Sequence, residues 1–105
     1  MSNFEVSKIT TMKSMFEGCT NLKKINFGDI NTSNVKNMEH LFFNCHSLES
    51  IDLSKFDTSQ VTTLEGMFSY CLSIKTIDAS NFNTSKVTTF YDMFSYCNNL
   101  ISVNV

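Results

Sequence analysis

The chain has 105 residues, four cysteines, three glycines and no proline, and its formal net charge is −2 at pH 7. Because 8 basic residues stand against 10 acidic ones, there is no cationic excess to neutralise phosphates, and we expect no nucleic acid among its partners. No run approaches the roughly 20 apolar residues that a membrane-spanning helix needs, so we also expect no membrane insertion. Residues 1–8 lack a basic start and an apolar centre, so this chain is expected to carry no signal peptide.

A 26-residue unit is repeated four times along the chain. Cys19, Cys45, Cys71 and Cys97 stand 26 residues apart, and most apolar residues keep the same step. Repeats of this length are typical of solenoids, in which each thin unit buries its apolar face against its neighbours. We therefore predict one domain over residues 1–105, an α/β solenoid with a parallel sheet on one face and short helices on the other. Its four units are expected at approximately 1–26, 27–52, 53–78 and 79–105.

Each unit is predicted to contain a short helix. From Val61 to Phe68 the apolar residues are spaced at three, three and one, which is helical, and from Leu64 to Cys71 they fall on one side of about two helical turns. Thr63 precedes this segment and is a favourable N-cap residue. The residues expected to cap the other units are Thr11, Asn37 and Thr89.

A strand is predicted next in each unit. From Leu48 to Leu53, apolar Ile51 and Leu53 alternate with Ser50 and Asp52, which is the pattern of a strand with one buried face. Strands that neighbour each other at about 4.8 Å turn every apolar column into a continuous ladder of a parallel sheet.

A polar bend follows the strand. Small residues such as those from Ser54 to Ser59 can bond to the backbone and turn the chain without glycine. Asp57-Thr58-Ser59 resembles the catalytic triplet of aspartic proteases, but Asn31 and Asn83 occupy the same column and cannot ionise. We therefore predict that this column forms hydrogen bonds at the turn.

A long motif covers the repeat and, through its copies, essentially the whole chain. The motif is Cys45-x-x-Leu48-x-x-Ile51-Asp52-Leu53-Ser54-x-Phe56-Asp57-Thr58-Ser59-x-Val61-Thr62-x-Leu64-x-x-Met67-Phe68-x-x-Cys71. It resembles the 26-residue bacterial surface protein repeat, a BspA-like branch of the leucine-rich repeats. The resemblance implies a leucine-rich-repeat solenoid, at the cell surface or secreted, that serves adhesion or protein binding without catalytic residues or cofactors.

The cysteines allow three interpretations. A ladder of buried thiols acting as small hydrophobes is favoured over disulfides between layers, because four inward thiols in register do not present the bridge geometry well. Metal binding is disfavoured, since the spacing is 26 and only His40 and His46 could assist. A hydrolase using Cys45 with the adjacent His46 is a further alternative, but adjacent residues usually point different ways and no other unit has histidine there.

Two asparagines lie in N-glycosylation sequons, Asn31-Thr32-Ser33 and Asn83-Thr84-Ser85. They indicate either a row of glycans on a secreted protein or the chance product of a bend rich in Asn, Thr and Ser. We favour the second interpretation, although a secreted source would reverse it.

Two surfaces are predicted to bind partners. The outward positions of the strands form the first surface, with residues Lys24, Asn26, Ser50, Asp52, Thr76, Asp78, Ser102 and Asn104. Aromatic residues outside the apolar columns form the second surface, because such residues are enriched in contact surfaces. These aromatic residues are Phe43, Tyr70, Tyr91 and Tyr96.

The two ends of the repeat show none of the polar caps that soluble solenoids carry. Exposed apolar residues are expected at the first unit: Met12, Phe16, Leu22 and Ile25. The equivalents expected at the last unit are Phe90, Phe94, Leu100 and Val103. Either the chain is a monomeric protein-binding segment of a longer array, or copies stack head to tail into a filament. The leading hypothesis is a non-enzymatic surface, adhesion or protein-interaction module, which associates with itself through its ends or binds a host or surface protein.

Overall fold

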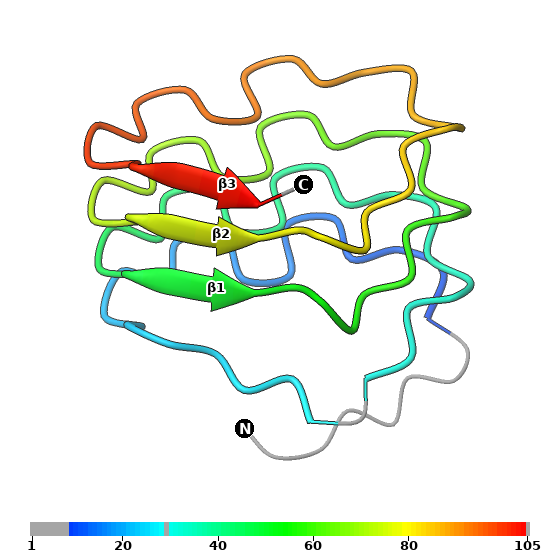
Figure 1. Cartoon of the computed structure of the whole chain (residues 1–105), viewed down its shortest axis with the longest axis horizontal. Helices are drawn as coiled ribbons and strands as arrows, with labels where there is room; N and C mark the ends of the chain where they lie inside the picture. Colours follow the sequence, from blue (N-terminus) through cyan, green and yellow to red (C-terminus); the bar gives the residue numbers. More distant parts are fainter. Residues whose placement is uncertain (1–8, 29, 105) are drawn as a thin grey trace.

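The computed structural model describes residues 9–28 and 30–104. These residues contain three strands and no helix: β1 (Ser50–Asp52), β2 (Thr76–Asp78) and β3 (Ser102–Asn104). The strands form one parallel sheet in the order β1-β2-β3, and each residue pairs with the residue one 26-residue unit later (Figure 1). The strands lie where the alternation predicted them, because the central Ile51 and Ile77 are buried between polar neighbours.

The predicted fold class, an α/β leucine-rich-repeat solenoid with short helices, is wrong. The segments expected as helices are runs of turns instead. Two positions in each of these segments have positive φ, for example Gly66 (φ 59) and Tyr70 (φ 62), whereas an α-helix needs negative φ throughout. The equivalent residues in the other units are Ser14, Gly18, His40, Asn44, Asp92 and Tyr96.

Backbone hydrogen bonds in these turns alternate between two kinds of partner. The Met67 N–H donates to the Leu64 carbonyl within the same turn at 3.2 Å, whereas the Phe68 N–H donates to the Met93 carbonyl of the next unit at 2.9 Å. In an α-helix all of these donors would bond inside the segment. Here every second donor joins neighbouring units, so the turns are bonded to each other much as strands are.

A stack of phenylalanine rings runs through the core beside the sheet. The Phe16 and Phe42 ring centroids lie 5.7 Å apart, those of Phe42 and Phe68 5.4 Å, and those of Phe68 and Phe94 5.9 Å. All three pairs are stacked, with interplanar angles of 6°, 15° and 2°. Apolar columns in register thus continue from unit to unit, which no single unit could achieve alone.

The ends of the stack differ from the sequence-based expectation. Met12 is 1% exposed and Phe16 is 8% exposed, so the predicted exposure of these two residues is wrong. In the last unit Phe90 is 50% exposed and Phe94 is 38% exposed, as expected for an uncovered layer. The remaining predicted end residues are half-buried: Leu22, Ile25, Leu100 and Val103.

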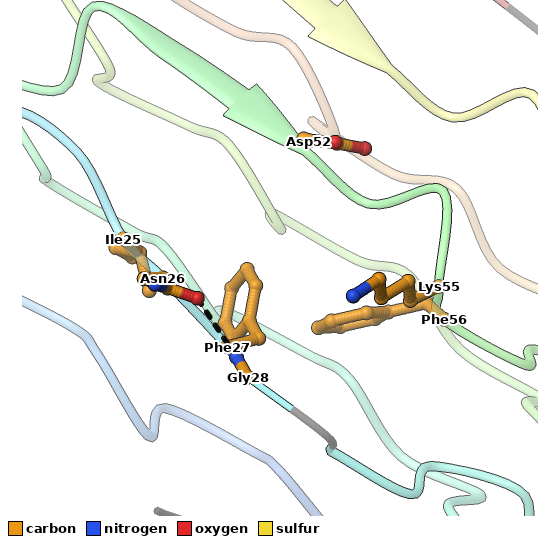
Figure 2. Close-up of a pocket in the computed structure, with 7 residues that line it drawn as sticks. All are labelled: Ile25, Asn26, Phe27, Gly28, Asp52, Lys55 and Phe56. Carbon is orange, nitrogen blue, oxygen red and sulfur yellow. Dashed lines mark hydrogen bonds between the residues drawn. The ribbon is translucent and has the colours of Figure 1, made fainter. Parts of the chain in front are cut away.

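The expected strand of the first unit does not form. Residues 22–27 are not a strand and do not pair with β1. A cavity of about 170 Å³ lies between this segment and the end of β1 with the bend that follows, and Phe27 and Phe56 both line it (Figure 2). The two rings meet edge to face at 4.8 Å, and the Gly28 N–H bonds to the Asn26 side chain at 2.9 Å.

Candidate protein-binding surfaces

Two of the outward polar residues of the strands, Asp52 and Asp78, bond to local turns. The carboxylate of Asp52 accepts a hydrogen bond from the Ser54 N–H at 2.9 Å, and that of Asp78 from the Ser80 N–H at 3.1 Å. Hydrogen bonds from the side chain and backbone of Ser54, with a smaller effect of the charge of Lys55, hold the pKa of Asp52 below its ordinary value. The acidic pair therefore closes the turns after β1 and β2.

Other members of this first predicted surface lie together on the sheet. Ser50, Thr76 and Ser102 pair across the three strands and line one shallow hollow with Asp52 and Asp78, whereas Lys24 and Asn26 are exposed outside the sheet. The side chain of Asn104 lies outside the described residues. The structure therefore gathers five of the eight predicted residues on one sheet face.

Three aromatic residues of the second predicted surface contact one another. The rings of Phe43 and Tyr70 meet edge to face at 5.6 Å, and those of Tyr70 and Tyr96 stack at 4.6 Å with an angle of 10°. His40 extends the line, since its ring lies 4.7 Å from that of Phe43. We call His40, Phe43, Tyr70 and Tyr96 the aromatic row. Tyr91 is highly exposed, but among the described residues no ring contact joins it to the row.

The aromatic row is built by the positive-φ turns. Tyr70 and Tyr96 both have φ 62 and occupy the same column as Gly18 and Asn44. Gly and Asn adopt this conformation most readily, so their presence in the column was a signal for the turn. Sequence reasoning missed His40, which occupies the other positive-φ position of its unit.

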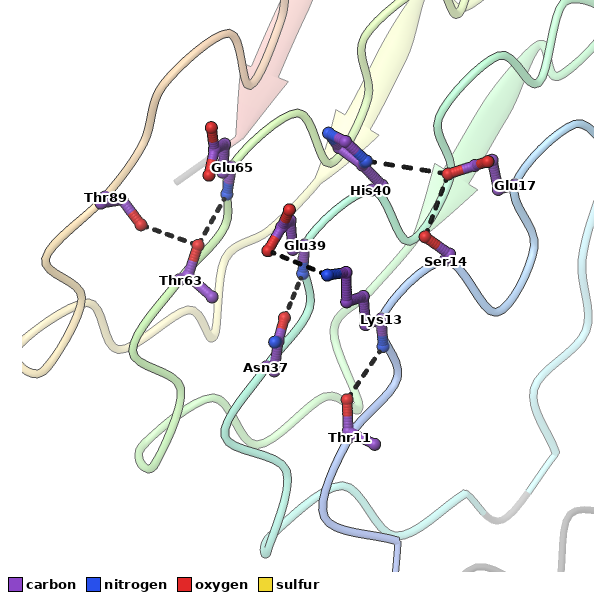
Figure 3. A network of polar contacts seen from close by, with 10 residues as sticks. All are labelled: Thr11, Lys13, Ser14, Glu17, Asn37, Glu39, His40, Thr63, Glu65 and Thr89. Carbon is purple, nitrogen blue, oxygen red and sulfur yellow. Dashed lines mark hydrogen bonds and ion pairs between the residues drawn. The ribbon is translucent and has the colours of Figure 1, made fainter.

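A polar network lies beside the aromatic row (Figure 3). The side-chain oxygens of Thr11, Asn37 and Thr63, expected to cap helices, accept the N–H two residues later at 3.2, 2.8 and 3.2 Å. They cap turns instead. The network also contains an ion pair between Lys13 and Glu39 at 3.8 Å, and His40 Nδ1 lies 3.7 Å from a Glu17 carboxylate oxygen. Such partly exposed pairs contribute little to stability.

The cysteines are free thiols. The interpretation as buried thiols is confirmed for Cys45 and Cys71, while Cys19 and Cys97 are half-buried. Each buried thiol donates to a phenylalanine carbonyl of the preceding unit, as from Cys45 to Phe16 at 3.2 Å. Burial raises the pKa of Cys45 to about 11 and that of Cys71 to about 12, so both are protonated at neutral pH. A protonated thiol is neither a strong nucleophile nor a metal ligand.

The bends contain both sequon asparagines, and both are exposed. The side-chain oxygen of Asn31 accepts the Ser33 N–H, and that of Asn83 accepts the Ser85 N–H, each at 3.0 Å. Asp57 makes the same bond to Ser59 at 3.0 Å, which confirms that this column serves the turn.

An apolar cavity of about 420 Å³ lies at the C-terminal end of the stack. Three of the predicted end residues line it, Phe90, Phe94 and Val103, together with Ala79 and Phe82.

In the described part of the chain, no group of histidine, cysteine and carboxylate side chains is arranged to hold a metal ion. Nor do residues 9–28 and 30–104 contain a helix of the length and apolar character that a membrane crossing requires.

Together these features describe a small repeat protein whose units are joined by backbone hydrogen bonds and whose surface has an aromatic row. A family model with the description "Mycoplasma protein of unknown function, DUF285" matches residues 1–103. The chain therefore belongs to this family. No curated protein and no solved structure matches the chain significantly.

Proposed function

We propose that this protein is a non-enzymatic binding module of the bacterial surface protein (BspA-like) repeat type, located at the cell surface or secreted, that contacts a host or surface protein. The motif from Cys45 to Cys71 supports the repeat type, and the aromatic row carries the proposal of binding. Tyrosines with an apolar body and a hydroxyl are enriched where proteins meet, and they dominate binding energy there.

The aromatic row is positioned before any partner arrives. The Tyr70 N–H donates to the Ser95 carbonyl and the Asn44 N–H to the Ser69 carbonyl, both at 2.8 Å, so the turns that hold the rings are fixed to their neighbours. Rings that are already ordered lose less conformational entropy on binding, which favours affinity. Tyr96 is 60% exposed and offers the largest accessible ring of the row.

The alternative of a hydrolase that uses Cys45 and His46 is less well supported. The Cys45 thiol is buried and donates to the Phe16 carbonyl, and its pKa is raised. A nucleophilic cysteine needs the opposite, an accessible thiolate with a lowered pKa. The other alternative, a monomeric segment of a longer array, would use the same aromatic row.

The proposal can be tested with beads that carry the chain and plates coated with fibronectin, collagen, mucin or serum albumin. We expect the beads to adhere to at least one coat more strongly than to albumin. The variant Tyr70→Ser/Tyr96→Ser should weaken that adhesion by about tenfold or more, because truncating hot-spot residues has effects of this size. The matched control is Tyr91→Ser, an exposed tyrosine outside the row. Adhesion to none of the coats, or an equal effect of both variants, would contradict the proposal.

A further inference from the structure

The last unit has a row of backbone donors that find no acceptor among residues 9–28 and 30–104. In the third unit the Leu64 N–H donates to the Thr89 carbonyl at 3.0 Å and the Gly66 N–H to the Tyr91 carbonyl at 2.8 Å. The corresponding donors of the last unit point beyond it, and within the described residues they donate no hydrogen bond. They are the N–H groups of Phe90, Asp92, Phe94 and Tyr96, which we call the tail edge.

The first unit has the complementary row of acceptors. In the second unit the Asn37 carbonyl accepts from the Met12 N–H at 2.8 Å, and the Glu39 carbonyl accepts from the Ser14 N–H at 2.9 Å. The equivalent carbonyls of the first unit accept no hydrogen bond from the described part of the chain. They belong to Thr11, Lys13, Met15 and Glu17, which we call the head edge.

We propose that the tail edge of one copy of this chain binds the head edge of a second copy. The register is the one that joins neighbouring units inside the chain, so the Phe90 N–H donates to the Thr11 carbonyl of the second copy. The other three donors follow in order, each to the next carbonyl of the head edge. This proposal concerns the backbone edges at the two ends of the stack, which share only Tyr96 with the aromatic row, and it goes beyond the proposed function.

Apolar side chains at both edges favour the same contact. Phe90 and Phe94 are exposed beside the 420 Å³ cavity at the tail edge. At the head edge Met15 is 38% exposed, whereas its counterparts Leu41 and Met67 are fully buried between units. Burial of such side chains is the main favourable term in association. Because Met12 and Phe16 are already buried, the head edge contributes its carbonyls and Met15.

The chemistry of these two rows favours head-to-tail contact, because two tail edges would oppose these donors to each other and two head edges would oppose these carbonyls. Bonds of the opposite direction fit the same register: inside the chain the Thr88 N–H donates to the Thr62 carbonyl at 2.8 Å, so the Thr10 N–H of the second copy would donate to the Thr88 carbonyl. Edge-to-edge pairing of backbone groups needs donors on one side and acceptors on the other. A contact between two different surfaces leaves one edge of each copy open, so it extends into a row of copies.

The test uses one blocked edge at a time. Phe90→Glu places a charge at the tail edge, Met15→Glu places one at the head edge, and Thr62→Glu is the charge-matched control at an exposed position in the third unit. In sedimentation velocity, the native chain and Thr62→Glu should shift from 11.9 kDa to successive multiples of this mass as the concentration rises. Each blocked variant alone should remain monomeric. Their mixture should form a dimer and no larger species, because each variant keeps one intact edge.

Three results would overturn the proposal: a native chain that stays monomeric up to about 1 mM, a mixture of the blocked variants that stays monomeric, or self-association of Met15→Glu alone. The last result would indicate a symmetric contact between tail edges. A second measurement needs no variant. Amide hydrogen exchange at Phe94 and Tyr96 should slow as the native chain is concentrated, whereas concentration-independent exchange at both residues would contradict the proposed register.

Discussion

Replacing Phe42 by alanine removes a fully buried ring from the middle of the phenylalanine stack. The ring contacts those of Phe16 at 5.7 Å, Phe68 at 5.4 Å and Phe27 at 6.2 Å. Truncating a buried phenylalanine costs about 3–5 kcal/mol through lost burial and the cavity that remains. Since a domain of this size has about 5–15 kcal/mol of stability, Phe42→Ala should remove a large share of the free energy of unfolding.

The matched variant is Phe94→Ala, at the open end of the same stack. Phe94 is 38% exposed and, within the part of the chain that the structure describes, its ring stacks only on that of Phe68, at 5.9 Å. With about three fifths of the burial and one stacked partner, its truncation should cost about 2 kcal/mol. We therefore expect Phe42→Ala to be more destabilising by about 1–3 kcal/mol.

Urea unfolding followed by circular dichroism measures this difference. The protein is kept dilute, because the tail edge would become covered in an assembly. The transition midpoint should fall with little change in the denaturant slope, which reports the surface exposed on unfolding. Losses that agree within about 0.5 kcal/mol for the two variants would show that the end of the stack is as enclosed as its middle, and would refute the reasoning.

Three further predictions concern single side chains. Since the pKa of Cys71 is 9.0 when unfolded and about 12 when folded, its contribution to stability is fully present below pH 9. That contribution falls by about 1.4 kcal/mol per pH unit above pH 9. In urea titrations from pH 8 to 11, the free energy of unfolding should decline less steeply with pH for Cys71→Ala than for the native chain. An equally steep decline would contradict the raised pKa of Cys71. Gly66→Ala should cost about 1–2 kcal/mol for its φ of 59, plus a further loss because the added Cβ meets the His40 imidazole. The further loss should vanish in a His40→Ala background, as measured by thermal unfolding of all four proteins. Thr58→Val should cost about 1–3 kcal/mol, because the Asn83 N–H, now bonded to the Thr58 hydroxyl at 2.7 Å, loses that partner. The control Thr84→Val, at an exposed position, should change the free energy of unfolding by less than about 0.5 kcal/mol. Equal losses for the two variants in urea unfolding would count against the role of the buried hydroxyl.

Burial could be predicted from the sequence where conformation could not. Leu64, Met67, Phe68 and Cys71 are all buried, as their spacing indicated. A pattern of apolar residues reports which side chains face the core, but it does not report where the backbone N–H groups donate. Every second donor here finds its acceptor 25 residues later, for example from Phe68 to Met93. This partner is distant in sequence, so local periodicity resembled that of a helix.

The candidate sites show the same division. Tyr70 and Tyr96 were correctly predicted to lie on the surface, because a large residue outside the apolar columns has no room in the core. His40 was missed because its place in the row depends on a positive φ in its own turn. Asp52 lies on the sheet face, as the alternation indicated, but the alternation did not predict that its carboxylate also closes the turn after β1. The predicted exposure of Met12 was wrong, because its side chain is 1% exposed although Met12 belongs to the first unit.

The alternation of hydrogen-bond partners restricts how the length of this protein can change. Suppose that one residue were inserted between Leu64 and Phe68. Each later N–H group of that turn would then change its direction, and the groups that now donate to the next unit would point back into their own unit. Neighbouring units would then lose several bonds at once, and buried donors without acceptors are costly. Gain or loss of a whole 26-residue unit leaves this alternation of hydrogen-bond partners unchanged. Family members should therefore differ in the number of units far more readily than in the length of one.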